Sequence, residues 1–298
     1  MIMHSYLRGI GFSEIDSRIE LEKLLSVIID EPTEKRTYKI NDKKIITEIS
    51  KDFSKHVGIT IRGEFDENGE FHLGHYFPFV RSQYISTREE ISIIKRVDTD
   101  AYTVMCDDIR LGVSLIFYLQ NVVDYLTAEK DFNHKRKVFP MQLSALSTRG
   151  KILLPIYHNE RQKKNKNAEV QYRRRLIKEA KEGNQDAIDS LTIDDIDIYA
   201  MISRRSKRED VYSIVETSFT PYGSESDNYS IIGTIIDVEK EVNEYTKEEI
   251  YMIVVNCNDV ILPVVLNKKD LYGEPVVGRR FKGTIWTQGF VDFSKDNI

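Results

Sequence analysis

The spacing of apolar residues changes along the chain, and each spacing predicts a different kind of element. Ser17 and Glu20 have the spacing of a helical capping box. An apolar stripe follows from Ile19 to Ile29 and ends before Pro32, which predicts a helix that covers a sheet. The next segments are short, rich in β-branched and aromatic residues, and bounded by turn residues. They predict strands at 44–49, 57–65, 71–80, 91–97, 101–106 and 110–119.

Short turns between these segments indicate that neighbouring strands are antiparallel. Asn68-Gly69 supplies the positive φ that a tight hairpin requires, and Asp107-Asp108 marks a second turn. A short helix over 121–130 and a hairpin of strands 141–147 and 150–157 complete the pattern. We therefore predict that residues 1–158 form an α+β domain in which helices cover an antiparallel sheet.

Residues 159–208 are dense in charge and rich in strong helix formers. A helix is predicted from Ala168 to Glu182, because Gly183-Asn184 is a good C-terminal stop. A second short helix follows Gln185, and Thr192 offers the start of a third that runs into basic residues. This segment is predicted to be a charged helical connector.

Residues 209–298 return to short strands and turns. They predict strands at 211–219, 229–238, 250–255, 260–266 and 281–293. Five strands fit a small closed β-barrel resembling the oligonucleotide/oligosaccharide-binding (OB) fold, in which Gly233 would let a long first strand bend. An SH3-like barrel and a small sandwich are the alternatives. We expect a compact β domain without a long helix.

The composition fits an ordinary globular protein. With 298 residues, 41% apolar and 31% charged, the chain is long enough for roughly two domains and is neither disordered nor membrane-embedded. Its longest apolar run, residues 111–119, is about half of the ~20 residues that a spanning helix needs. The first residues lack the features of a secretory signal, and Cys106 and Cys257 lie in strand-like runs that favour buried, reduced thiols. We expect a cytoplasmic protein that does not enter a membrane.

The net charge of −5 is unevenly distributed. Counting Lys and Arg against Asp and Glu gives 21 against 23 in residues 1–150, 14 against 9 in 151–208 and 8 against 16 in 209–298, or −2, +5 and −8. The basic middle segment either matches the acidic C-terminal segment, within one chain or between subunits, or offers its charge to an external anion.

Three motifs together resemble a bacterial family of uncharacterised proteins. They are the opening Met-His-Ser-Tyr-Leu-Arg-Gly-Ile-Gly-Phe-Ser, the central Glu182-Gly-Asn-Gln-Asp-Ala-Ile-Asp-Ser-Leu-Thr192 and the terminal Gly278-Arg-Arg-Phe-Lys-Gly-Thr-Ile-Trp286. The resemblance covers nearly the full length of the chain. Members have no established activity, so the resemblance implies no catalytic residue.

The hairpin around Asn68-Gly69 carries the residues most like metal ligands, which are Glu64, Asp66, Glu70, His72 and His75. His72 and His75 are three positions apart, which points them to opposite faces of a regular strand. We therefore expect no shared metal ion and no cofactor. A bulge at Gly74 would change the parity and bring both imidazoles to one face.

Two basic clusters are the candidate binding residues. The first comprises Arg173, Arg174, Arg175 and Lys178, within a stretch of nine positive charges between 161 and 181. The second comprises Arg279, Arg280 and Lys282, with Trp286 beside them. Consecutive arginines fan out around a helix, so they cannot all face one groove. The segment from Gly278 to Gly283 lacks the Lys-Ser/Thr ending of a phosphate-binding P-loop.

Short catalytic motifs are absent from the sequence, including the nucleophile elbow, the dinucleotide-binding glycines and the zinc-protease helix. We therefore predict a non-enzymatic interaction or adaptor protein that acts through protein contacts or self-association. A nucleic-acid or nucleotide-binding protein that uses the basic helix and the Arg279–Lys282 loop is one alternative, disfavoured by the acidic C-terminal segment. A metal-dependent hydrolase with a site around His72 and His75 is the other.

Overall fold

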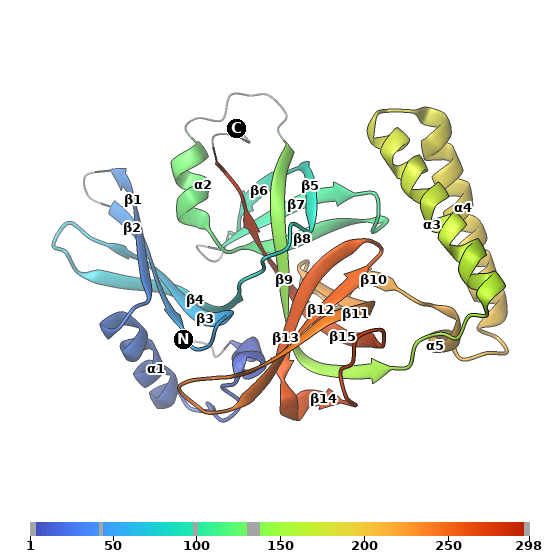
Figure 1. Cartoon of the computed structure of the whole chain (residues 1–298). Coiled ribbons are helices and arrows are strands. Elements are labelled where there is room, and N and C mark those ends of the chain that lie inside the picture. Colours follow the sequence, from blue (N-terminus) through green and yellow to red (C-terminus); the bar gives the residue numbers. More distant parts are fainter. Residues whose placement is uncertain (1–3, 42–43, 98–100, 130–137, 295–298) are drawn as a thin grey trace.

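The computed structural model describes residues 4–41, 44–97, 101–129 and 138–294 of the 298-residue chain (Figure 1). It is an α+β structure in which two sheets lie side by side and a pair of long helices extends to one side. Among the described residues, no helix is both long and apolar enough to cross a membrane.

The first sheet is antiparallel, as predicted, with the order β1-β2-β3-β4. Its strands are β1 (Glu34–Asn41), β2 (Lys44–Asp52), β3 (Val57–Phe65) and β4 (Phe71–Val80). Two helical elements precede it, η1 (Ser5–Ile10) and α1 (Arg18–Asp30). The capping box of Ser17 and Glu20 is formed, and α1 buries Leu21, Leu24 and Ile28 in one core with β3. The predicted covering helix is therefore confirmed.

The second sheet has eleven strands, and its main order is β10-β11-β12-β13-β9-β15-β8-β7-β6. The strands from the first half of the chain are β5 (Thr87–Glu90), β6 (Ser92–Lys95), β7 (Tyr102–Asp108), β8 (Val113–Leu119) and β9 (Val138–Leu153). Those from the second half are β10 (Ser218–Pro221), β11 (Asn228–Val242), β12 (Glu249–Cys257), β13 (Val260–Asn267), β14 (Leu271–Tyr272) and β15 (Arg280–Val291). The helical elements between them are α2 (Val122–Ala128), α3 (Glu160–Lys181), α4 (Gln185–Arg205), α5 (Val211–Ile214) and η3 (Lys268–Asp270).

Strands from both sides of the predicted boundaries at 158 and 209 share this sheet. β15 pairs antiparallel with β9 from Met141 to Leu153, antiparallel with β11, and parallel with β8. One hydrophobic core accordingly contains Leu115 and Phe117 of β8 together with Ile253 and Val255 of β12. Residues 229–266 contain no helix, as expected, but their strands do not make a separate sheet.

The hairpin predicted at 141–157 is wrong, because β9 runs unbroken from Val138 to Leu153. Gly150, which suggested a turn, is needed for packing instead. A Cβ there would lie 2.5 Å from the ring of Phe281 on the paired strand β15. The glycine therefore allows close approach of a neighbouring side chain and does not reverse the chain.

The helical segment also differs from the prediction. α3 begins at Glu160 after a capping box of Asn159 and Gln162, and α4 is one helix where two were predicted. The Thr192 hydroxyl donates to the Ile188 carbonyl one turn earlier, so Thr192 lies inside α4 and does not cap a new helix. The strand predicted at 211–219 is α5 followed by β10.

Polar contacts hold the two sheets together. Arg62 of β3 is 2% exposed and donates twice to one carboxylate oxygen of Glu48, at 2.6 and 2.9 Å. It also donates to the Tyr118 hydroxyl of β8 in the second sheet (3.2 Å) and to the backbone carbonyl of Gln120, the residue after β8 (3.2 Å). Burial raises the pKa of the Glu48 carboxyl, although the charge of Arg62 opposes this shift. This buried pair is thus part of the junction between the sheets.

We expect Glu48→Ala to lower the free energy of unfolding by about 3–5 kcal/mol, because it leaves the Arg62 guanidinium buried without its carboxylate. Urea denaturation of the purified chain measures the change. The double variant Glu48→Leu, Arg62→Met removes both charges and should recover most of the loss. A double variant as unstable as Glu48→Ala would contradict this account of the junction.

Candidate functional sites

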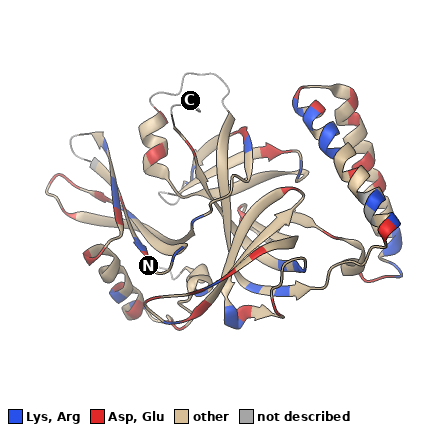
Figure 2. Ribbon diagram, in the orientation of Figure 1, with Lys and Arg blue, Asp and Glu red and all other residues tan. Residues whose placement is uncertain are grey.

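The helical pair α3–α4 extends away from the two sheets, and Figure 2 shows that it carries both basic and acidic residues along its length. Three of the basic side chains on α3 are bound within the protein. Arg173 forms an ion pair with Asp195 of α4 at 2.9 Å, and Arg174 binds both carboxylate oxygens of Asp259 at 2.7 and 2.8 Å. Lys181 pairs with Glu89 of β5. The hydrogen bond from Arg174 lowers the pKa of Asp259.

The remaining predicted residues of this cluster face solvent. Arg175 lies 3.8 Å from Glu179 on the same helix and its side chain is 65% exposed, and Lys178 is exposed. The side chains of Lys163 and Lys166 lie outside the described residues. The structure therefore divides the predicted cluster. Arg173 and Arg174 form ion pairs that position the helical pair, although the Arg174 side chain is still 53% exposed, while Arg175 and Lys178 are exposed on α3.

The outer face of α4 carries large apolar side chains, which were not among the predicted binding residues. α4 buries Ala187 and Leu191 together with Leu176 and Ala180 of α3. Because an α-helix turns 100° per residue, Ile193 and Ile196 project away from that contact, and Tyr199 lies to one side of it. They are 60%, 61% and 75% exposed. We call Ile193, Ile196, Tyr199 and the exposed Ala200 the α4 face.

The basic residues of the second predicted cluster bind groups within the protein. Arg280 is 4% exposed, and its guanidinium donates to three backbone carbonyls, those of Leu154, Tyr212 and Val215. These carbonyls lie on the two chain segments that lead into and out of the helical pair. Lys282 binds the Tyr212 hydroxyl and lies over its ring, and Arg279 donates to the Glu274 carbonyl at 3.0 Å. The three basic residues therefore have partners within the protein.

Trp286 is also buried, at 6% exposure. Its indole nitrogen donates to the Asp227 carboxylate at 3.0 Å, and its ring stacks on Tyr6 at a centroid distance of 5.5 Å. His4 packs on the same ring, and burial lowers the pKa of His4 to about 4. Trp286 thus anchors the N-terminal segment and is not presented for stacking with a ligand.

The hairpin of β3 and β4 contains the bulge considered at Gly74. Arg62 pairs with His75 and Gly63 pairs with Leu73, so Gly74 has no opposite residue and His72 and His75 come to one face. They still bind different partners. His72 pairs with Asp66 at 3.0 Å near Glu70, whereas the His75 ring lies 2.8 Å from the Tyr118 hydroxyl. The trio of half-buried Asp66 with exposed Glu70 and His72 has the residue types of a metal site, without His75.

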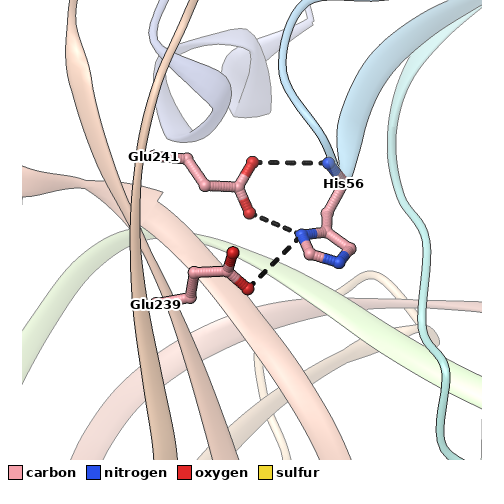
Figure 3. Close-up of side chains that lie close together, drawn as sticks. All are labelled: His56, Glu239 and Glu241. Carbon is pink, nitrogen blue, oxygen red and sulfur yellow. Dashed lines mark hydrogen bonds and ion pairs between the residues drawn. The ribbon is translucent and has the colours of Figure 1, made fainter.

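A second group of potential ligands lies at the junction of the sheets, and Figure 3 shows that His56 faces Glu239 and Glu241. His56 is in the turn between β2 and β3, and both glutamates are on β11. The His56 Nδ1 atom is 2.6 Å from Glu241 and 3.8 Å from Glu239. Glu241 also accepts hydrogen bonds from the Ser54 hydroxyl (2.5 Å) and from the His56 backbone N–H (3.3 Å).

A cavity of about 190 Å³ adjoins this group. His56, Gln83, Asp237 and Glu239 are among the residues that line it. Sequence reasoning missed the group because His56 and Glu241 are 185 positions apart and belong to no short motif. The only local signal is the alternation of acids at 237, 239 and 241.

A larger cavity of about 280 Å³ lies between the sheets and is lined by Glu48, Phe77 and Phe290, among others. Its charged residues already have protein partners: Arg36 binds Asp124 at 2.8 Å and Arg81 binds Asp52 at 2.5 Å. The volume is at the lower limit of ordinary ligand pockets. It offers a polar crevice with apolar walls, without an unpaired charge that would select a ligand class.

We expect Arg280→Lys to loosen the base of the helical pair. One ammonium group cannot reach three carbonyls with the geometry of a guanidinium, so the free energy of unfolding should fall by about 2–3 kcal/mol. Limited proteolysis should cut earlier in residues 155–160 and 206–217. Arg279→Lys is the matched control, because Arg279 is bound to a single exposed carbonyl and should change stability by less than about 0.5 kcal/mol. Equal protease resistance of Arg280→Lys and the unmodified chain would refute the role of Arg280.

Among the comparisons with known proteins, only the one with sequence families gave a match. No curated protein and no solved structure matches it. Residues 7–289 match the family described as "Domain of unknown function, E. rectale Gene description (DUF3881)". This match covers nearly the whole chain, including both sheets and the helical pair, and the chain therefore belongs to the DUF3881 family of unknown function.

Proposed function

We propose that this protein is a cytoplasmic, non-enzymatic interaction protein that associates with a second copy of itself through the α4 face. The observation that carries the proposal is the exposure of Ile193, Ile196 and Tyr199 in one row on a helix that extends away from the sheets. Contiguous apolar surface of this kind marks sites of protein contact. The two free, buried thiols agree with a reducing compartment.

The charges around the α4 face favour a second copy as the partner. The first half of α4 carries acids, including Asp186 and Asp189, whereas Arg204, Arg205 and Lys207 follow at its end. Two copies of α4 that pack antiparallel about a two-fold axis near Ile196 would bring the acidic half of each onto the basic end of the other. Asp186 and Arg204 lie on the same edge of the face by helical periodicity, so they would meet across the axis.

The size of the face sets the expected strength of association. Three large apolar side chains on one helix cover less surface than a standard stable interface. We therefore expect a reversible dimer with a dissociation constant of roughly micromolar order. In such a dimer the four helices would form the junction, and the two sheets of each copy would lie at opposite ends of it. This arrangement is compatible with an adaptor.

We also infer that β11, β12, β13, β9 and β15 form the OB-like barrel expected from the sequence. Each strand in this series pairs with the next, and β15 pairs back with β11. β9 precedes the helical pair in the sequence, so the barrel would be assembled from two separate parts of the chain. This inference explains why the expected five-stranded pattern is incomplete within residues 209–298.

Ile196→Glu should abolish self-association, because it places a charge at the centre of an apolar contact. Sedimentation velocity at roughly 1–200 µM protein measures the monomer–dimer equilibrium. Val277→Glu is the matched control: Val277 is also 60% exposed but lies in the turn before β15, so dimerisation should persist. Asp186→Arg should weaken the dimer and the added Arg204→Asp should restore it. A chain that stays monomeric at 200 µM would refute self-association.

We expect single-stranded and duplex nucleic acid to bind only weakly, with a dissociation constant above roughly 10 µM at ~150 mM salt. Arg173, Arg174 and Lys181 are already paired with acids, and the surrounding C-terminal segment repels phosphate. Fluorescence anisotropy with labelled oligonucleotides measures this binding. Submicromolar binding with a steep salt dependence that flattens in the Arg173→Ala, Arg174→Ala, Arg175→Ala variant would favour the nucleic-acid alternative instead.

A further inference from the structure

We propose that His56, Glu239 and Glu241 form a binding site for one divalent transition-metal ion of the zinc class. The three residues come from two elements that meet at the junction of the sheets, the turn after β2 and the strand β11. Their ligand atoms all lie within 4.8 Å of one another. Imidazole nitrogen and carboxylate oxygen are ligands that zinc and related ions accept.

The distances leave room for an ion with little rearrangement. Ligand atoms around a tetrahedral zinc ion, each about 2.0–2.2 Å from it, are about 3.3–3.6 Å apart. The 3.8 Å between His56 Nδ1 and Glu239 is already close to this spacing. The 2.6 Å between Nδ1 and Glu241 is a hydrogen bond, so the ion would take the place of the Nδ1 proton, and this pair would move apart by about 1 Å. A neutral ring would move its one proton to Nε2, whereas a charged ring would keep its Nε2 proton and release the Nδ1 proton to solvent.

Neighbouring groups hold the ligands in place. The far nitrogen of the His56 ring, Nε2, lies 3.3 Å from the Gln83 amide nitrogen. When the ion binds Nδ1 and the proton is on Nε2, a half-turn of this amide would let its oxygen accept from Nε2–H and fix the plane of the imidazole. The Ser54 hydroxyl and the His56 backbone N–H fix the Glu241 carboxylate. His56 and Glu241 have side chains only 5% and 6% exposed. Such outer contacts are what a metal site needs for pre-organised ligands.

Charge and access also favour a cation here. Glu239 and Glu241 face the same imidazole nitrogen, and Lys55, which binds Glu239 at 2.9 Å, offsets one of the two negative charges. Glu239 is 38% exposed and borders the cavity of about 190 Å³, through which an ion can enter. Three protein ligands leave a fourth position of a tetrahedral ion for water or a small ligand from that cavity.

The site differs from the one that the sequence pattern of the β3–β4 hairpin suggests. There, the candidates were His72 and His75, which bind different partners. The trio of Asp66, Glu70 and His72 is the competing location, but its His72 side chain is 62% exposed and its residues belong to one surface hairpin. The experiment therefore has to tell His56 from His72.

The full-length chain is stripped with chelator and titrated with Zn²⁺ by calorimetry, and Co²⁺ is added in parallel to record the ligand-field absorption. We expect one ion per chain, and a Co²⁺ spectrum typical of four-coordination. Glu239→Gln should weaken Zn²⁺ binding at least tenfold. This variant keeps the hydrogen bonds of Glu241 and His56 intact, so it should stay folded, which thermal unfolding checks.

Two further variants make the result decisive. Lys55→Ala removes the competing cation from Glu239 and should tighten Zn²⁺ binding. His72→Ala should leave it unchanged. Absence of Zn²⁺ and Co²⁺ binding at about 100 µM protein would overturn the proposal. So would binding that His72→Ala abolishes and Glu239→Gln leaves intact.

Discussion

The pairing of β15 with β9 is the constraint on which the rest of the structure depends. It extends from Arg280 opposite Leu153 to Val291 opposite Met141, and it joins the end of the chain to a strand that precedes the helical pair. β15 also pairs with β8 and β11, so it brings strands from both halves of the chain into one sheet. Because β9 leads into α3 and β10 follows α5, this pairing also holds the base of the helical pair closed.

Ion pairs fix the orientation of the helical pair, and helical periodicity determines which of its side chains face solvent. Arg174 reaches Asp259 in the turn between β12 and β13, and Lys181 reaches Glu89 of β5, so α3 is tied to the second sheet at both contacts. α4 then packs on α3 through Ala187 and Leu191. The part of the α4 surface outside this contact faces solvent, which is why Ile196 and Tyr199 are exposed. The basic charge that suggested an external anion thus serves first to hold α3.

Local sequence patterns predicted an element correctly where residues close in sequence determine its structure. The capping box at Ser17, the hairpin at Asn68-Gly69 and the end of α3 at Gly183 depend on residues close in sequence, and all three are formed. Long-range packing decided the rest. Gly150 suggested a turn, but its lack of a side chain makes room for Phe281. Arg280 suggested an exposed cation, but it is buried and donates to three backbone carbonyls. Neither partner can be read from neighbouring positions, because each lies more than sixty residues away.

The His56 group could not be predicted from the sequence, because the face of β11 to which its glutamates point depends on an irregularity of the strand. On β11, Ile231 and Ile235 point into the core of the second sheet, so regular alternation would send Glu239 and Glu241 into that core as well. A bulge at Ile236 shifts the register, since Ile235 pairs with Val255 and Asp237 with Val254.

Beyond the bulge, Val238 packs on the core of the second sheet, while Glu239 and Glu241 lie opposite Met252 and Ile250, whose side chains join the core of the first sheet. One inserted residue therefore carries two carboxylates out of an apolar core and toward the turn that holds His56. The bulge at Gly74 acts in the same way on His72 and His75. At both places the irregularity of a strand, and not its pattern, decides which side chains meet.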